Sequence, residues 1–173
     1  MELFIDTLLS PIGEVRLISD GTYLRAVDFD DYEARMQELL LKHYGPVKLV
    51  NKKNPGDATS RLREYFDGEL EAITALKVMS NGSDFQQQVW QMLCKIPAGE
   101  TWSYGQLAKA IGNPKASRAV GLANGSNPIA IVVPCHRVIG ANGTLTGYGG
   151  GLSRKRWLLA HEGAIPQQQF SLS

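Results

Sequence analysis

The chain has 173 residues, of which 43% are hydrophobic and 20% charged, with two cysteines, Cys94 and Cys135. This size allows one globular domain or two small ones, and two cysteines in unrelated settings exclude a disulfide framework. No apolar run has the length of about 20 residues that a membrane helix needs, and the first residues lack the basic region of a secretory signal, so we expect a cytoplasmic protein.

The formal net charge of +1 is unevenly distributed along the chain. Residues 1–80 carry 10 basic and 14 acidic side chains, whereas residues 81–173 carry 8 and 3. A basic half joined to an acidic half indicates that the basic half meets a polyanion, although a chance fluctuation gives the same counts.

Residues 1–80 are predicted to form an α/β domain on an antiparallel sheet. Alternating apolar residues favour strands over 3–8, 14–18 and 23–27, with turns at Ser10–Gly13 and Asp20-Gly21. A helical stripe from Tyr32 to His43 stops at Gly45-Pro46, and a short helix covers Leu62 to Phe66. Residues 47–57 are polar and turn-rich. No active-site grouping occurs in this half.

A boundary is expected near Ser80–Gly82, followed by a mostly helical domain over residues 81–165 and a disordered tail over 166–173. Ser83 and Ser103 each begin a capping box, which predicts a helix start at both positions. Asn113-Pro114 is expected to cap a third helix running from Lys115 to Gly125, and Ser153 to cap the last helix.

The second and third of these helices have the outline of a helix-turn-helix. The third carries Lys115, Ser117, Arg118 and Asn124, which suit phosphate and base contacts, and its small face, including Ala119, allows close approach to a partner. Many helix pairs that do not bind DNA share this outline, so the local pattern leaves both interpretations open.

The stretch Ile131–Gly140 places Cys135, His136 and Arg137 inside an apolar run. We expect Cys135 to lie where a buried strand ends after Pro134, facing a cleft. His136 and the carboxylate of Glu162 form the best relay available to activate this thiol. The alternative is that Cys135 is a small buried hydrophobe and His136 a satisfied core histidine. Cys94, on a helix without an adjacent imidazole, is interpreted as core packing.

The glycine-rich segment Gly147–Gly151 lacks the arrangement of a nucleotide-phosphate loop, so its glycines are expected to admit a ligand close to the backbone, with Tyr148 as a wall. The cysteines and histidines do not have zinc spacing, and neither a metal nor a cofactor is expected.

Three segments together resemble the O6-alkylguanine-DNA alkyltransferases, also called methylated-DNA–protein-cysteine methyltransferases. They are Pro134–Val138, the preceding Asn127-Pro128, and Tyr148 with Trp157–Gly163. The resemblance runs from about Phe85 to Gly163, and residues 1–80 are more weakly similar to the N-terminal domain of the bacterial constitutive type. It implies a ribonuclease H-like α/β domain followed by a mostly α, winged-helix-like domain with a helix-turn-helix.

The resemblance also implies direct, irreversible, single-turnover transfer of an alkyl group from guanine O6, and from thymine O4, to Cys135. It implies that His136 takes the thiol proton through a water, that Glu162 orients His136, and that Asn127 braces the active-site turn. It further implies that Tyr104 lies near the rotated phosphate and can donate a proton to the guanine leaving group, and that Arg118 fills the stack after the base is flipped through the minor groove of double-stranded DNA. The resemblance assigns Tyr148, Val138, Gly149 and Trp157 to the alkylguanine pocket. A monomer is implied, with possible cooperative assembly on DNA.

Two positions depart from the vertebrate pattern, since Gly149 replaces a serine and Ala130 a proline of the pocket wall. A more open pocket that accepts bulkier alkyl groups is therefore expected. Beside a suicide alkyltransferase, two other functions are considered: a non-catalytic module that binds DNA lesions, and a cysteine hydrolase that uses Cys135 and His136.

Overall fold

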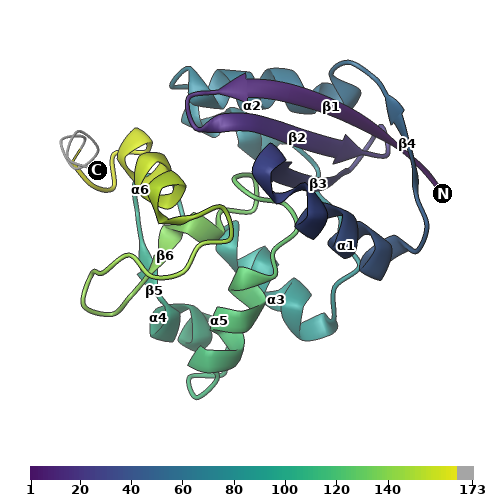
Figure 1. The fold of residues 1–173 in the computed structure, drawn as a ribbon. Coiled ribbons are helices and arrows are strands. Elements are labelled where there is room, and N and C mark those ends of the chain that lie inside the picture. Colours follow the sequence, from purple (N-terminus) through teal and green to yellow (C-terminus); the bar gives the residue numbers. More distant parts are fainter. Residues whose placement is uncertain (167–173) are drawn as a thin grey trace. The chain divides into compact units, whose positions relative to one another are not determined.

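The computed structural model describes residues 1–166, so the predicted tail lies outside the described residues except for Pro166. The chain divides into two compact units (Figure 1). Unit 1 comprises Met1–Asn81 and Pro128–Val132, and unit 2 comprises Gly82–Asn127 and the described residues from Val133 onward. The chain therefore returns to unit 1 for the five residues Pro128–Val132, shortly before Cys135. The predicted single boundary near residue 81 does not account for this return.

Unit 1 is built on a four-stranded sheet in the order β3-β2-β1-β4. Its strands are β1 (Glu2–Ser10), β2 (Gly13–Ser19), β3 (Leu24–Phe29) and β4 (Lys48–Asn51). The first three strands pair antiparallel, with Leu8 opposite Val15 and Leu17 opposite Val27. The turns that connect them fall where the sequence predicts them.

The fourth strand corrects the sequence interpretation in two respects. Residues 48–51 lie in the segment that was expected to consist of turns, and they pair parallel with β1, with Leu3 opposite Leu49. The sheet is therefore mixed and not antiparallel. A four-residue edge strand with exposed ends carries too little alternation to be distinguished from a polar loop.

Two helices cover the sheet of unit 1. They are α1 (Glu33–Tyr44), which follows the short 3-10 helix Asp30–Tyr32, and α2 (Ala58–Phe66), between the 3-10 helices Pro55–Asp57 and Leu70–Ala75. Met36 and Leu40 of α1 pack on Leu3, Ile18 and Ala26. Because Leu17 and Ile18 point to opposite faces and both are buried, the second face must also be covered, and α2, which contacts β1 and β2, covers it (Figure 1).

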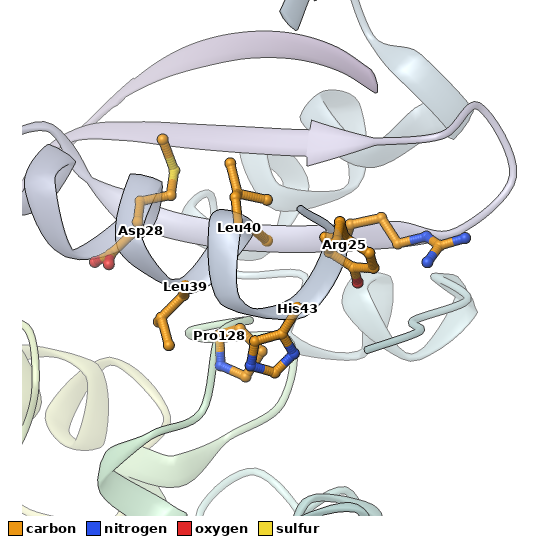
Figure 2. Close-up of a pocket in the computed structure, with 9 residues that line it drawn as sticks. Arg25, Asp28, Leu39, Leu40, His43 and Pro128 are labelled. Carbon is orange, nitrogen blue, oxygen red and sulfur yellow. The ribbon is translucent and has the colours of Figure 1, made fainter. Parts of the chain in front are cut away.

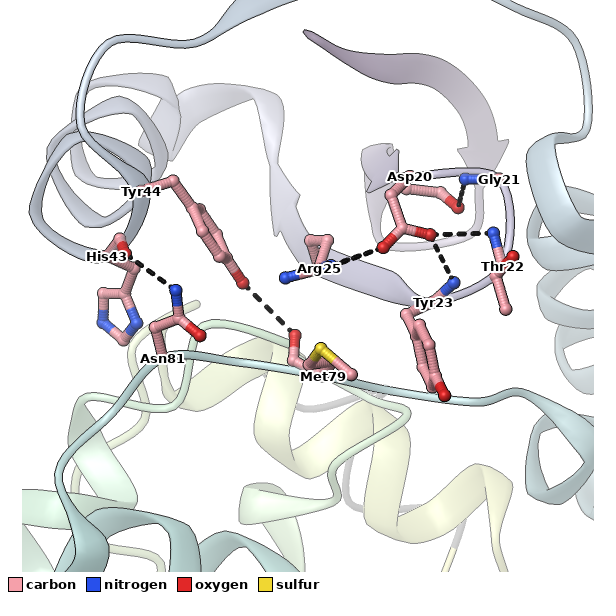
Figure 3. Close-up of polar contacts among 10 residues, drawn as sticks. Asp20, Gly21, Thr22, Tyr23, Arg25, His43, Tyr44, Met79 and Asn81 are labelled. Atoms are coloured by element: carbon pink, nitrogen blue, oxygen red, sulfur yellow. Dashed lines mark hydrogen bonds and ion pairs between the residues drawn. The ribbon is translucent and has the colours of Figure 1, made fainter. Parts of the chain in front are cut away.

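Polar contacts tie the end of the first segment of unit 1 to α1 (Figure 3). The hydroxyl of Tyr44 donates to the carbonyl of Met79 at 3.3 Å, and Asn81 Nδ2 donates to the carbonyl of His43 at 3.1 Å. The nearby turn is closed by Asp20, whose Oδ2 accepts from Arg25 Nη2 at 2.6 Å. These contacts hold residues 79–81 against the helix up to the point where unit 2 begins.

Unit 2 contains four helices among its described residues, namely α3 (Asp84–Leu93), α4 (Tyr104–Ala110), α5 (Ser117–Gly125) and α6 (Leu152–His161). Two short strands, β5 (Trp102–Ser103) and β6 (Val138–Ile139), pair parallel. Both predicted capping boxes are confirmed, since Ser83 and Ser103 accept from the backbone of Gln86 and Gln106 at 3.1 Å. No helix among residues 1–166 is long and apolar enough to cross a membrane.

Two of the predicted caps are wrong. Asn113-Pro114 lies in a turn that the backbone N–H of Ala116 closes on the carbonyl of Asn113, and α5 begins only at Ser117. The last helix begins after Gly151 and has no side-chain cap, so Ser153 lies inside its first turn. In both cases a residue with good capping chemistry stands near the helix start but not at the position that faces the unpaired N–H groups.

The first residue of unit 2 makes a close contact that limits its side chain. A Cβ placed on Gly82 would lie 2.3 Å from Cζ3 of Trp90, whose Nε1 donates to the carbonyl of Ala123 at 2.8 Å. We expect Gly82→Ala to lower the free energy of unfolding by about 1–3 kcal/mol, because the buried indole must shift. Urea unfolding measures this, with Gly125→Ala as control, since a Cβ there meets nothing within 4 Å. Equal stability of the two variants would contradict the prediction.

Candidate active site

Cys135 begins a 3-10 turn, Cys135–Arg137, and is 7% exposed. The expectation that it ends a buried strand is wrong. Of the preceding residues Ile129 bridges to Val27, but Ile131 has a φ of +71° and the chain then turns repeatedly up to Cys135. A β-branched residue in the left-handed region is strained, so packing must hold this loop in place. The apolar run correctly indicates that this segment is buried. Its apolar pattern alone predicts a strand, whereas the segment is a buried loop.

Two asparagines brace the turn that carries the thiol. Asn127 Nδ2 donates to the carbonyl of Val133 at 2.8 Å, and Asn124 Nδ2 donates to the carbonyl of Cys135 at 3.3 Å. The contact of Asn127 agrees with its expected bracing role. The prediction that Asn124 contacts DNA is wrong, because this side chain is 5% exposed and lies on the inner face of α5.

The carboxylate of Glu162, at the C-terminal end of α6, joins His136 and Arg137. Its Oε2 lies 2.8 Å from His136 Nε2, and its Oε1 accepts from Arg137 Nε at 2.8 Å. Burial by itself would raise the pKa of Glu162, but His136 and Arg137 outweigh burial and hold that pKa far below its usual range. Glu162 is therefore a carboxylate at every pH at which the protein is expected to work. The sequence predicts the pairing with His136 but not the ion pair with Arg137.

His136 is fully buried, and its two ring nitrogens have different surroundings. Because Nε2 faces a carboxylate, the neutral imidazole carries its proton on Nε2 and leaves Nδ1 as an acceptor. Nδ1 makes no hydrogen bond within residues 1–166. The ring of Tyr148 stands edge-on to the imidazole, with centroids 6.5 Å apart. The interpretation of His136 as a fully satisfied core histidine is therefore not supported, since one of its nitrogens is unpaired there.

Lys155 is a buried charged residue that sequence reasoning missed. Its side chain is fully buried in α6, and Nζ donates to the carbonyls of Val138 and Thr146, both at 2.6 Å, and of Gly147 at 3.4 Å. Burial lowers its pKa to about 8, while Cys135 acts in the opposite direction. A signal existed in the sequence, because Lys155 is spaced three and four residues from the buried Leu158 and Leu159.

Of the other pocket residues expected from the resemblance, Val138 precedes the loop over residues 140–147, Tyr148 and Gly149 follow it, and Trp157 lies in α6. Val138 is fully buried, and Tyr148 and Gly149 are half-buried and precede α6. Trp157 stacks on His161 within α6, with ring centroids 4.6 Å apart. Ala130 belongs to the returning segment of unit 1.

The predicted helix-turn-helix is formed by α4 and α5. Arg118 and Ala119 are exposed on α5, Ser117 is half-buried at its first position, and the exposed Lys115 precedes the helix. Tyr104 begins α4, and its hydroxyl lies 3.2 Å from Thr146 Oγ1. A Cβ on Gly121 would lie 3.8 Å from the Tyr104 ring, so the two helices approach closely at this point.

Two further features are separate from the turn that carries Cys135: the second cysteine, in unit 2, and a small cavity, in unit 1. Cys94, expected in the core, is instead exposed at the C-terminal end of α3. The cavity, next to His43 and Pro128 (Figure 2), has a volume of ≈ 10 Å³, which holds about one water molecule. Within residues 1–166 no three His, Cys, Asp or Glu side chains are grouped to bind a metal ion.

Comparison with known proteins gives matches over nearly the whole chain. Residues 3–79 match the ribonuclease-like domain, and residues 84–164 the DNA binding domain, of 6-O-methylguanine DNA methyltransferase. The chain is 49% identical to a methylated-DNA–protein-cysteine methyltransferase of Shigella flexneri, covering 95% of this chain and 98% of that protein. A relative of the same name from Methanosarcina acetivorans is 49% identical, covering 90% of this chain and 95% of the relative.

Solved structures give the same result. The chain is similar to Mycobacterium tuberculosis OGT in complex with DNA, with a TM-score of 0.79, 42% identity and 100% of both chains covered. It is also similar to the O6-methylguanine-DNA methyltransferase of Pyrococcus kodakaraensis, with a TM-score of 0.74, 27% identity, and 93% and 99% of the two chains covered. The expected fold class, a ribonuclease-like α/β unit followed by a helical DNA-binding unit, is confirmed, with the sheet mixed.

Proposed function

Since the chain belongs to the 6-O-methylguanine DNA methyltransferase family, it repairs DNA directly by methyl transfer to a cysteine, and we propose that this cysteine is Cys135. The observation that carries the assignment is the 2.8 Å contact between His136 and Glu162 beside a buried thiol. Cys94 is exposed at the C-terminal end of α3, and desolvation raises the pKa of its thiol, which disfavours the reactive thiolate.

The arrangement supports an in-line displacement at the alkyl carbon. His136 Nδ1 takes the Cys135 proton through one water, and the carboxylate of Glu162 stabilises the imidazolium that forms. The thiolate then attacks the carbon attached to guanine O6, so that the S–C bond forms as the C–O bond breaks. Guanine leaves with the electron pair and is protonated, and we assign this proton to the hydroxyl of Tyr104, which contacts Thr146 in the loop before Tyr148. The thioether is stable, so each molecule reacts once.

The DNA-binding unit supports delivery of the base to this thiol. The family binds DNA, and we assign the contacts of this chain to the exposed side of α5, where Arg118 and Ala119 lie, and to Lys115 and Ser117 at its start. The small residues of α5 suit the narrow minor groove, and Arg118 fills the stack that the flipped nucleotide leaves. Double-stranded DNA with an alkylated guanine is the proposed substrate, and O4-alkylthymine a second one.

The pocket for the extruded base is assigned to Tyr148, Val138, Gly149 and Trp157, with Asn127 bracing the turn that presents the thiol. Tyr148 already stands edge-on to His136, which supports its role as a wall next to the reacting group. Gly149 adds no side chain to this wall, so we propose that bulkier alkyl groups are accepted. Residues 1–80 and 81–165 are proposed as the two domains, and a cytoplasmic monomer without cofactor as the working form.

Intact-mass measurement after incubation with a duplex containing O6-methylguanine tests the proposal. We expect one increment of a single methyl group per chain, which is absent in Cys135→Ser and retained in Cys94→Ser. Binding without an increment would support a lesion-binding module instead. Hydrolysis of an ester or peptide with repeated turnover would support a cysteine hydrolase.

A further inference from the structure

Two hydroxyl groups of unit 2 meet although they lie far apart in the sequence. Tyr104 is the first residue of α4, and Thr146 lies in the loop over residues 140–147, which contains neither helix nor strand. Tyr104 Oη lies 3.2 Å from Thr146 Oγ1, and either atom can be the donor. Because Tyr104 is half-buried and Thr146 is exposed, a base that enters the site from solvent can reach this pair.

The backbone on both sides of the contact is held in place. The start of α4 is fixed by the capping box that precedes Tyr104. The tip of the loop is closed by the N–H of Gly140, which donates to the carbonyl of Thr144 at 2.8 Å. The carbonyl of Thr146 itself accepts from Lys155 Nζ at 2.6 Å. The two hydroxyls are therefore presented to each other by structured backbone.

We propose that Thr146 is a positioning residue for Tyr104, and that its hydroxyl donates to Tyr104 Oη while the phenol gives its own proton to the leaving guanine. This inference rests on the proposed function. A hydroxyl has one proton to donate and lone pairs that accept. If the phenol proton bonded Thr146, it would point away from the guanine, whereas donation by Thr146 leaves that proton free for transfer.

The contact strengthens as the reaction proceeds. The O···O distance of 3.2 Å is long for two neutral hydroxyls, which commonly lie about 2.7–2.8 Å apart. As the O–H bond of Tyr104 breaks and an N–H bond of guanine forms, the phenol oxygen becomes an anion, which holds an O–H donor more closely and about twice as strongly. Tyr104 afterwards regains its proton from water. An interaction that is stronger in the transition state than before it raises the rate.

A double-mutant cycle on free benzylguanine tests this assignment. Thr146→Val keeps the branched shape of the side chain and removes the hydroxyl, and we expect the rate constant for benzyl transfer to fall at least about fivefold. In Tyr104→Phe, which has no phenol proton to transfer, adding Thr146→Val should change the rate constant by less than about twofold, because the two hydroxyls act as one unit. Thr146→Ser keeps the hydroxyl and should stay within about twofold of the wild type. Thr22→Val, at an exposed position of unit 1, is the matched control.

A second reagent separates proton transfer from access to the thiol. Iodide leaves without a proton, so the rate constant of iodoacetamide alkylation at Cys135 should agree within about twofold between Thr146→Val and the wild type. Peptide mapping follows Cys135 separately from Cys94. An equal fall with both reagents would assign Thr146 to the shape of the site alone and overturn the inference.

Three further results would also overturn it. A benzylguanine rate that is unchanged or higher in Thr146→Val would show that Tyr104 is the donor of the contact. Equal effects of Thr146→Val with and without the phenol would show that the two side chains act independently. A loss in Thr146→Ser as large as that in Thr146→Val would show that the hydroxyl does not carry the effect.

Failure of the proposed function gives a different result. If the wild-type protein transfers neither benzyl from benzylguanine nor methyl from a duplex, the proposed function falls and this inference falls with it. If the wild type reacts and Thr146→Val matches it, only the inference falls. Because Thr146 is exposed, its variants are expected to fold, and thermal melting checks this.

Discussion

Replacing Glu162 with glutamine is expected to cost the protein both its stability and its reaction. Arg137 would remain buried beside a neutral amide, and such a broken buried ion pair costs about 3–5 kcal/mol. His136 would lose the carboxylate that stabilises its protonated form, so we expect the rate of alkyl transfer to fall by about 100-fold or more. Urea unfolding and the rate of methyl transfer from a duplex measure the two effects.

The matched control is Glu100→Gln, which removes the same charge from an exposed position of unit 2. We expect its stability and rate to remain within experimental error of the wild type. Equal losses of unfolding free energy and transfer rate in Glu100→Gln and Glu162→Gln would show that the effect comes from the net charge of unit 2 and not from the buried contacts.

The pH dependence of stability should identify the same carboxylate. Because the pKa of Glu162 in the folded protein lies far below its usual value, the unfolded chain binds this proton at a higher pH than the folded one. The free energy of unfolding therefore rises with pH between the folded and the unfolded pKa of Glu162. The stabilisation by Glu162 is fully present above its unfolded pKa of about 4.3 and is lost as the pH falls through its folded pKa. The stability difference between wild type and Glu162→Gln should be constant near neutral pH and shrink below about pH 4.

Arg118→Ala is expected to separate repair in duplex DNA from the chemistry at the thiol. Only a duplex requires the base to be extruded, at a cost of a few kcal/mol, so losing the side chain that fills the stack should slow duplex repair by about 10- to 100-fold. The reaction with free benzylguanine should change by less than about twofold, because Arg118 is exposed on α5 and lies outside the turn that carries Cys135. Single-turnover rates on both substrates give this ratio.

Arg63→Ala provides the comparison, since it removes an exposed arginine from α2 of unit 1. Its duplex and benzylguanine rates should both match the wild type. An equal loss on the two substrates in Arg118→Ala would place this arginine in the chemical step and contradict its role in holding the extruded conformation.

The sequence by itself predicts the features that depend on neighbouring residues. Ser83 and Ser103 begin their helices because each capping box closes within four residues, and the strands of the first hairpins follow from alternation and turn residues. The pairing of His136 with Glu162 was also predicted, from the need of a histidine base for a carboxylate and from the resemblance to a known family.

The tertiary structure decided the features that join distant residues. The parallel pairing of β4, the positive φ of Ile131, and the inward position of Asn124 depend on surfaces that no local pattern records. The same holds for Arg137 on Glu162 and Lys155 on the carbonyls of the loop. A charged residue is predicted to be exposed from sequence, because its burial is favourable only where polar partners surround it. Those partners come from distant parts of the chain and meet only in the folded protein.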